Sequence, residues 1–362
     1  MRLAVLGTGL MGASVGLAAA RRGDDVAGWD PDERALATAA DRGAVTPSAS
    51  LEEAVADAEL AVVAAPIAQL PAQVAAVLAA TGERTTVTDV GSTKATVVAA
   101  AAGSPRFVGG HPICGSHARG PEHATAELFD QATWFLTPTA QTDPARHRLV
   151  HGFAADLGAT PVAIDAAAHD RLVALTSHVP HALANVIVNQ TGESRVEGHE
   201  PLLNAGGSLR DMTRIAGANP RIWIDIFLDN RAAVREALAE HRRRIEQVEA
   251  ALDEGDAGFL ARWIGEASRN RRRMLERAYD DLGALQRLRV HVPDRPGVLA
   301  GVTQALGAER INIEDFELQH MSPERGGTLT LLVTGEDEAR RAADLLEAQG
   351  YGVVVSAVLD EG

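Results

Sequence analysis

The sequence is poor in cysteine, in long apolar runs and in positive charge. Its one cysteine, Cys114, excludes an intramolecular disulfide and a zinc site built on cysteines. Apolar stretches such as residues 60–66 fall short of the ~18–20 residues that a membrane helix needs. The 34 basic residues face 49 acidic ones, a net charge of −15 that argues against a nucleic-acid scaffold. We therefore expect a soluble, cytoplasmic protein that binds neither nucleic acid nor membrane.

The 362 residues form three regions by pattern. Over residues 1–168, short apolar strand-like runs alternate with helix-like segments, which predicts a Rossmann-type, doubly wound and mostly parallel sheet. Residues 169–284 carry helical periodicity and no strand signals, so we expect an all-α domain that packs across a dimer interface. Residues 285–362 read β-α-β-β-α-β, the order of a ferredoxin-like α+β domain. The predicted fold class is α/β with these three domains.

A glycine-rich turn follows the first predicted strand. Gly7, Gly9 and Gly12 form G-x-G-x-x-G between that strand and a helix, and Asp30 ends the next strand. This context predicts a dinucleotide diphosphate on the helix N-terminus, with Asp30 binding the ribose hydroxyls. The charge of Asp30 repels a 2′-phosphate, so we expect NAD rather than NADP. The remaining cofactor-binding candidates are Leu10, Met11 and Pro66.

Two later strands end in polar residues, where open α/β sheets place their chemistry. Ser92 follows one strand in DVGSTK, and His111 follows the next in GGHPICGS. A histidine titrates near neutral pH, so His111 can accept a proton while hydride leaves a carbinol carbon, and Ser92 can orient it. Ser92 as a helix cap is the alternative. Lys94 is left open between phosphate and structural pairing, and Cys114 is expected to be a small buried residue.

Histidines and arginines gather in the helical region. Ser177 and His181 share a helix face at i,i+4 spacing, with His178 offset by one residue and His169 upstream. Zinc binding by the three histidines is one alternative, but no carboxylate completes an obvious set, so we expect no metal.

Two arginines follow at i,i+4 spacing. Arg210 and Arg214 can clamp carboxylates through paired hydrogen bonds, or they can form structural pairs with Asp211 and Asp225.

Together these motifs resemble the prephenate dehydrogenase family, which includes arogenate and cyclohexadienyl dehydrogenases. The resemblance runs over about residues 1–282 through GTGLMG, DVGSTK, GGHPICG, HD…SHVPHALAN and SLRDMTRIA…NPRIWIDIFLDN. The segment VPDRPGVLAGVTQALGAERINIEDF is similar to ACT domains, small amino-acid-sensing modules.

The resemblance implies NAD-dependent oxidative decarboxylation of prephenate to 4-hydroxyphenylpyruvate in tyrosine synthesis. His111 and Ser92 would be catalytic. The implied substrate-binding residues are Arg214, His181, Ser177, Ser116, His117, Arg210 and His169. His117 inclines the choice toward the keto acid prephenate over the ammonium-bearing arogenate. A homodimer with tyrosine feedback is implied, with the effector at Asp294, Pro296, Gly297 and Asn312. A catalytically inactive amino-acid sensor is the remote alternative.

Overall fold

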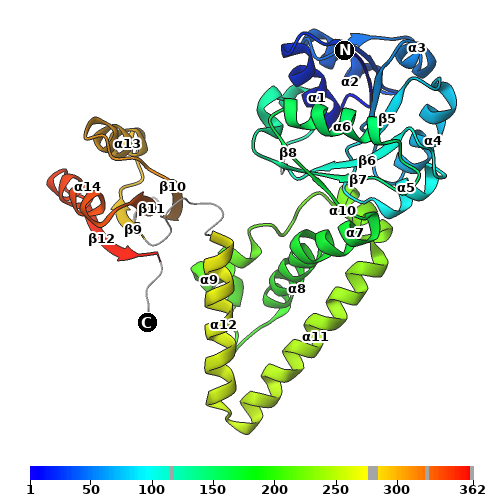
Figure 1. Cartoon of the computed structure of the whole chain (residues 1–362). Helices are drawn as coiled ribbons and strands as arrows, with labels where there is room; N and C mark the ends of the chain where they lie inside the picture. Colours follow the sequence, from blue (N-terminus) through cyan, green and yellow to red (C-terminus); the bar gives the residue numbers. More distant parts are fainter. Residues whose placement is uncertain (115–117, 276–283, 323–325, 359–362) are drawn as a thin grey trace. The chain divides into compact units, whose positions relative to one another are not determined.

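The computed structural model describes residues 1–114, 118–275, 284–322 and 326–358 (Figure 1). It divides into two compact units, Met1–Ile245 and Glu246–Gly362. The first unit holds a large sheet and the helices that follow it, and the second holds a smaller sheet with its own helices.

An eight-stranded sheet of order β3-β2-β1-β4-β5-β6-β7-β8 forms the body of the first unit. Every neighbouring pair is parallel except β6 and β7, which run antiparallel. The mostly parallel, doubly wound sheet expected from the alternating pattern is therefore confirmed. Its strands are β1 (Arg2–Leu6), β2 (Asp25–Trp29), β3 (Thr46–Pro47), β4 (Leu60–Val63), β5 (Thr86–Asp89), β6 (Phe107–Pro112), β7 (Thr133–Thr137) and β8 (Thr160–Ala163).

Helices bury both faces of this sheet (Figure 1). Alternate residues of β1 enter two different cores, with Leu3 and Val5 in one and Ala4 and Leu6 in the other. A strand covered on both sides reads as a continuous apolar run, as the first strand does. The covering helices are α1 (Leu10–Arg21), α2 (Glu33–Asp41), α3 (Leu51–Val55), α4 (Leu70–Ala80), α5 (Ala95–Ala100) and α6 (Pro144–Asp156).

One long helical stretch leaves the sheet after β8. It comprises α7 (Ala166–Val173), a π-helical turn over Ala174–His178, and α8 (Val179–Glu193). Pro180 has no N–H for a regular helical bond, and the wider turn before it accommodates that loss. The elements that follow in the chain are α9 (Gly207–Thr213), α10 (Pro220–Asp229), α11 (Arg231–Glu254) and α12 (Ala257–Leu275).

The stretch Ala166–Glu193 is long and apolar enough to cross a membrane by length and composition. Its most apolar 18 residues have a mean hydropathy of 1.2, and 28% of them are buried. It carries His169, Asp170 and His178, which hydrogen-bond each other or neighbouring elements inside the first unit. These contacts hold the first half of the stretch inside the first unit, whereas Leu175 and Val186 lie on an uncovered side.

The C-terminal sheet has the order β10-β11-β9-β12 and is antiparallel throughout. Its elements are β9 (Leu285–Val292), α13 (Val298–Ala308), β10 (Asp315–Ser322), β11 (Gly326–Thr334), α14 (Glu336–Ala348) and β12 (Gly352–Ala357). Both helices pack on the face that carries Leu288, Val290 and Leu331. The predicted β-α-β-β-α-β module is confirmed.

Candidate active site

The glycine turn after β1 has the geometry that a dinucleotide requires. Gly7 has φ +97°, and a Cβ there would meet the Ala64 carbonyl, while a Cβ on Gly12 would meet the Gly7 carbonyl. Gly9 has open space where its side chain would be, and it starts α1 without a side-chain cap. The turn is thus closed toward the protein and open above the helix N-terminus, where a diphosphate fits.

Asp30 is tied to the same turn. Its carboxylate accepts hydrogen bonds from the Thr8 N–H at 2.6 Å, the Thr8 hydroxyl at 3.2 Å and the Asp32 N–H at 2.8 Å. The cap of α2 is Asp32, so Asp30 is not simply a helix cap. Asp30 lies half-buried at the end of β2, beside the open turn.

His111 lies near the end of β6 and takes part in a series of buried polar groups. Its Nδ1 lies 2.9 Å from Nε2 of His169, whose Nδ1 lies 2.8 Å from the Asp170 carboxylate. Asp170 also accepts the N–H groups of Lys94 and Ala95 at the start of α5. We call Asp170, His169 and His111 the acid–imidazole series.

Electrostatics favour a neutral His111. Burial, followed by the neighbouring His169, Lys94 and His178, holds the pKa of His111 well below its usual range. The pKa of Asp170 is lowered, because hydrogen bonds from His169, Ala95 and Lys94 outweigh the opposing effect of burial. The series therefore places a carboxylate at one end and a neutral imidazole, that of His111, at the other.

Sequence reasoning gave His169 a minor role and missed Asp170. The signal for both was the adjacent pair HD, but only the packing of α7 against β7 and α5 reveals its use. Phe135 of β7 contacts the His169 ring edge-to-face at 5.5 Å and fixes it from the other side.

The expected polar helix face follows the π-helical turn. His181 binds the Ser177 carbonyl through Nδ1 at 3.0 Å and stacks on Trp223 of α10, with ring centroids 3.6 Å apart. His178 is buried against Asn230, and burial lowers the pKa of His178 to about 4. His178 is thus a neutral core histidine. Trp223 was missed, although it stands within NPRIWIDIF.

The two arginines are exposed. Arg210 lies in α9 and Arg214 directly follows it, and neither forms an ion pair within the described residues. The alternative pairs with Asp211 and Asp225 are therefore wrong. The loop is held to α8, because the Gly217 N–H binds the Asn185 side chain at 3.3 Å. Both guanidinium groups are available to an anionic ligand.

The remaining site candidates have varied positions. Ser92 is half-buried after β5, and the cap of α5 is Lys94, so Ser92 is not that helix cap. Pro66 is exposed after β4.

Cys114 is half-buried, and burial raises the pKa of its thiol to about 12, so it is no nucleophile. Ser116 and His117 lie outside the described residues, which contain no cluster of three metal-binding side chains.

The candidate effector residues lie before and after α13 in the chain. Gly297 precedes this helix with φ +88°, a conformation that favours glycine. Asn312 follows the helix and binds the Glu314 side chain at 2.8 Å. Asp294 and Pro296 lie in the loop between β9 and α13.

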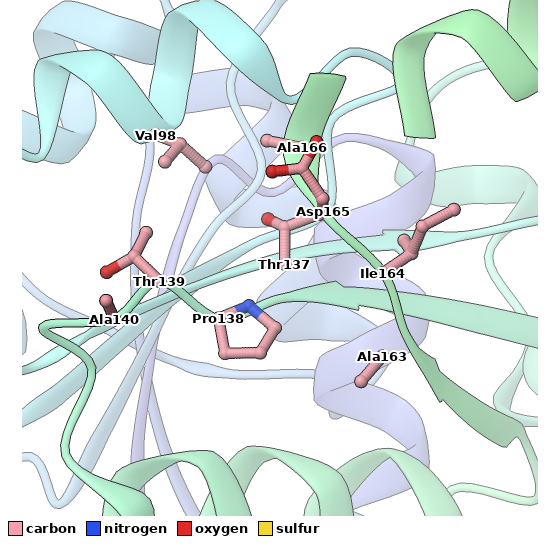
Figure 2. Close-up of a pocket in the computed structure, with 9 residues that line it drawn as sticks. All are labelled: Val98, Thr137, Pro138, Thr139, Ala140, Ala163, Ile164, Asp165 and Ala166. Atoms are coloured by element: carbon pink, nitrogen blue, oxygen red, sulfur yellow. The ribbon is translucent and has the colours of Figure 1, made fainter. Parts of the chain in front are cut away.

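A separate crevice of about 460 Å³ opens where β7 and β8 end (Figure 2). Figure 2 shows Thr137 and Asp165 at its wall, together with the apolar Val98, Ile164 and Pro138. None of the candidate site residues lines it, so it is distinct from the acid–imidazole series.

Comparison with known proteins decides the family. The model described as "Prephenate dehydrogenase, nucleotide-binding domain" matches residues 15–163, and "Prephenate dehydrogenase, dimerization domain" matches residues 165–266. The chain belongs to the prephenate dehydrogenase family. It is an NAD-dependent oxidoreductase. A model described as "ACT domain" matches residues 286–350, which confirms the expected C-terminal module.

Individual members of this family are similar along most of the chain. The prephenate dehydrogenase of Bacillus subtilis is 32% identical over 95% of this chain and 95% of its own. The cyclohexadienyl dehydrogenase of Zymomonas mobilis is 28% identical over 74% of this chain and 94% of its own.

Solved structures agree. Prephenate dehydrogenase from Aquifex aeolicus, in complex with hydroxyphenyl propionate and NAD⁺, has a TM-score of 0.71 and 27% identity, covering 76% of this chain and 98% of that one. The Synechocystis arogenate dehydrogenase has a TM-score of 0.69 and 25% identity, covering 76% of this chain and 100% of that one.

Proposed function

We propose that this chain oxidises prephenate with NAD⁺ and decarboxylates it to 4-hydroxyphenylpyruvate, with His111 as the catalytic base. The observation that carries the proposal is the acid–imidazole series, which ends at His111 on the strand beside β5. Family membership supports the substrate class, and the open glycine turn supports the cofactor.

The series selects one tautomer at each ring. Asp170 is a carboxylate and only accepts, so the Nδ1 of His169 carries a proton, and in the tautomer we propose its Nε2 is the acceptor toward His111. His111 must then donate from Nδ1 to that acceptor. This assignment follows from the hydrogen-bond network and leaves the Nε2 lone pair of His111 free to accept a proton. A neutral His111 with a free Nε2 is the form that a general base requires.

In the proposed reaction, Nε2 of His111 removes the proton from the ring hydroxyl of prephenate. The carbon that bears this hydroxyl gives up a hydride, for which NAD⁺ would be the acceptor. The residues that would hold NAD⁺ are Gly7, Gly9, Leu10, Met11, Gly12, Asp30 and Pro66. The ring carboxylate then leaves as CO₂, its bonding electrons complete the aromatic ring, and the phenolate regains the proton from His111. Ser92 orients the hydroxyl or His111. Atoms and electrons balance with prephenate and NAD⁺ giving 4-hydroxyphenylpyruvate, CO₂ and NADH.

We assign substrate binding to charged and polar groups of the helical region and to two residues that follow His111 in the sequence. Arg214 binds a substrate carboxylate, and Arg210 assists it from the same exposed segment. His181, fixed by Trp223, supplies a polar wall with Ser177. His169 acts through His111, and Ser116 and His117 complete the set by sequence.

Arogenate is the second candidate substrate. The cyclohexadienyl dehydrogenase of Z. mobilis and the arogenate dehydrogenase of Synechocystis are both similar to this chain, so amine-bearing substrates occur among its relatives. The test is NADH production at saturating prephenate and at saturating arogenate, with NAD⁺ and NADP⁺ in parallel. Turnover of prephenate with NAD⁺ supports the proposal, and turnover of arogenate alone transfers the assignment to that substrate.

The role of His111 is tested by His111→Asn. We expect kcat to fall by ~10²–10⁴-fold, since the base is lost. NAD affinity should remain, because the glycine turn is untouched. Unchanged turnover would remove His111 from the mechanism.

The assembly and its regulation extend the proposal. The match to a dimerization domain and the uncovered side of the stretch Ala166–Glu193 support a homodimer. We assign the protein to the cytoplasm. We also assign tyrosine as an effector, bound near Asp294, Pro296, Gly297 and Asn312. Asn312→Ala should weaken tyrosine inhibition while basal turnover stays, and Arg340→Ala, at an exposed position of α14, is the control. Equal inhibition in both variants would place the effector elsewhere.

A further inference from the structure

We propose that Lys94 is a positioning residue that holds both ends of the acid–imidazole series, His111 through Gly110 and Asp170 through its own backbone N–H. This inference rests on the proposed role of His111 as the base. It concerns a residue that sequence reasoning left open between two uses.

The side chain of Lys94 fixes the residue before His111. Its ammonium pairs with the Asp89 carboxylate and donates to the Gly110 carbonyl at 2.8 Å, and the Gly110 N–H donates to Asp89 at 3.0 Å. The backbone pairing of β5 with β6 ends at Thr88 and Val108. Beyond these residues, the contacts of Lys94 and Asp89 with Gly110 hold β6 in place of strand pairing. Both polar backbone groups of Gly110 are thus held by one buried ion pair.

The backbone of Lys94 fixes the other end of the series. Lys94 is the N-cap residue of α5 and lacks a side-chain cap, so its N–H and that of Ala95 are unsatisfied within the helix. Both donate to Asp170, at 2.8 and 2.9 Å. Asp170 therefore caps α5 from α7 and at the same time orients His169. A displacement of Lys94 disturbs both supports of His111.

The composition of the chain makes this position stand out. Lys94 is the only lysine in the sequence, and the other 33 of the 34 basic residues are arginines. Its side chain is completely buried. A compact ammonium with three donors reaches Asp89 and Gly110 from one point, whereas a planar guanidinium needs more room. Because the Lys94 side chain is completely buried, a larger guanidinium would have to displace its neighbours.

Charge adds a second effect on the base. The charged and titratable groups that act on His111 directly are His169, Lys94 and His178. Behind them, the Asp89 carboxylate binds Lys94 and the Asp170 carboxylate binds His169. The positive charge of Lys94 contributes, after burial and His169, to the lowered pKa of His111. Loss of this charge should raise that pKa, so that His111 needs a higher pH to act as a base.

The kinetic test compares Lys94→Met with Lys94→Arg. Both lose the geometry, and a displacement of about 1 Å at a reacting group can cost ~10²-fold in rate. We expect kcat to fall by about that factor in both, with KM for NAD⁺ within about twofold of wild type. The acidic limb of the kcat/KM–pH profile should move to higher pH in Lys94→Met, and much less in Lys94→Arg, which keeps the charge.

Two further variants serve as controls for effects on folding. Asp89→Asn combined with Lys94→Met leaves no lone buried charge, so it should fold while kcat stays low, because the Gly110 carbonyl has lost its donor. Arg106→Met is the matched control, since Arg106 also binds backbone carbonyls, at Leu78 and Gly82, but does not contact the series. Activity losses that merely follow the fall in melting temperature across all four variants would overturn the proposal.

The single lysine also permits a test without turnover. Labelling with ¹³Cε-lysine produces one side-chain signal for the whole chain. We expect this signal to shift with pH as His111 titrates, and this step to vanish in His111→Asn. Identical titrations in both proteins would overturn the inference. If wild type oxidises no prephenate but the step is present, the proposed function fails while the coupling stands.

Discussion

The Nδ1 atom of His111 and the Nε2 atom of His169 lie 2.9 Å apart, across the junction of strand β6 and helix α7. The first residue belongs to the sheet that carries the glycine turn, and the second to the helical stretch that follows β8. This hydrogen bond makes the orientation of the base depend on how α7 docks against the sheet. The predictions below follow from that dependence and from the charges around it.

Replacement of Asp170 by asparagine should impair the base without removing it. An amide nitrogen turned toward His169 Nδ1 would donate to it, reverse both tautomers and place the proton on Nε2 of His111. It would also lose the hydrogen bond from the Lys94 N–H, which the same carboxylate oxygen accepts. We expect kcat to fall by ~10²–10⁴-fold with the substrate KM little changed. Steady-state kinetics check this, with Asp229→Asn as the control, since Asp229 binds Thr96 of α5 but lies outside the series. Equal effects in the two variants would contradict the tautomer argument.

Arg214→Ala should mainly weaken substrate binding. A charge-assisted hydrogen bond is worth ~1.5–3 kcal/mol, so KM for prephenate should rise roughly tenfold to a hundredfold. Arg195→Ala is the matched control, because Arg195 is also exposed but pairs with Glu200. A normal KM in Arg214→Ala would exclude this arginine from the carboxylate site.

Asp30→Ser should reduce the preference for NAD⁺ over NADP⁺. The substitution removes the negative charge that repels a 2′-phosphate, and it also loses contacts to Thr8, so kcat/KM for NAD⁺ should fall while that for NADP⁺ rises. The ratio of the two kcat/KM values is the measurement. Asp25→Ser, at the opposite and exposed end of β2, removes the same charge and should leave the ratio unaltered. Equal use of both cofactors by wild type would contradict the role of Asp30.

Stability should fall as the pH drops below about 6.5. The pKa of His178 is about 4 in the folded state, below its ordinary value of 6.5, because of burial. The unfolded chain therefore binds more protons in this window, and the free energy of unfolding decreases toward low pH. We expect a loss of roughly 2–3 kcal/mol from this group between pH 7 and pH 4, and His111 adds to it in the same direction. Chemical denaturation at several pH values measures the slope, which should be shallower in His178→Asn.

Local chemistry made much of the fold predictable. Residues 3–6 of β1 are apolar because a central parallel strand is buried on both faces. The spacing of Gly7, Gly9 and Gly12 reflects a turn that excludes side chains at two positions. These constraints act within a few residues, so the sequence shows them directly. The same holds for the C-terminal module, whose strand and helix patterns alternate over short distances.

The sequence by itself determined the cofactor turn, the candidate base His111 and the family. Only the tertiary structure decided which groups act on that base. Asp170, Lys94 and Gly110 are far apart in the chain and come together because β5, β6 and α7 meet at one edge of the sheet. Their hydrogen bonds form only when these elements have packed and excluded water, and no spacing along the chain encodes such a meeting.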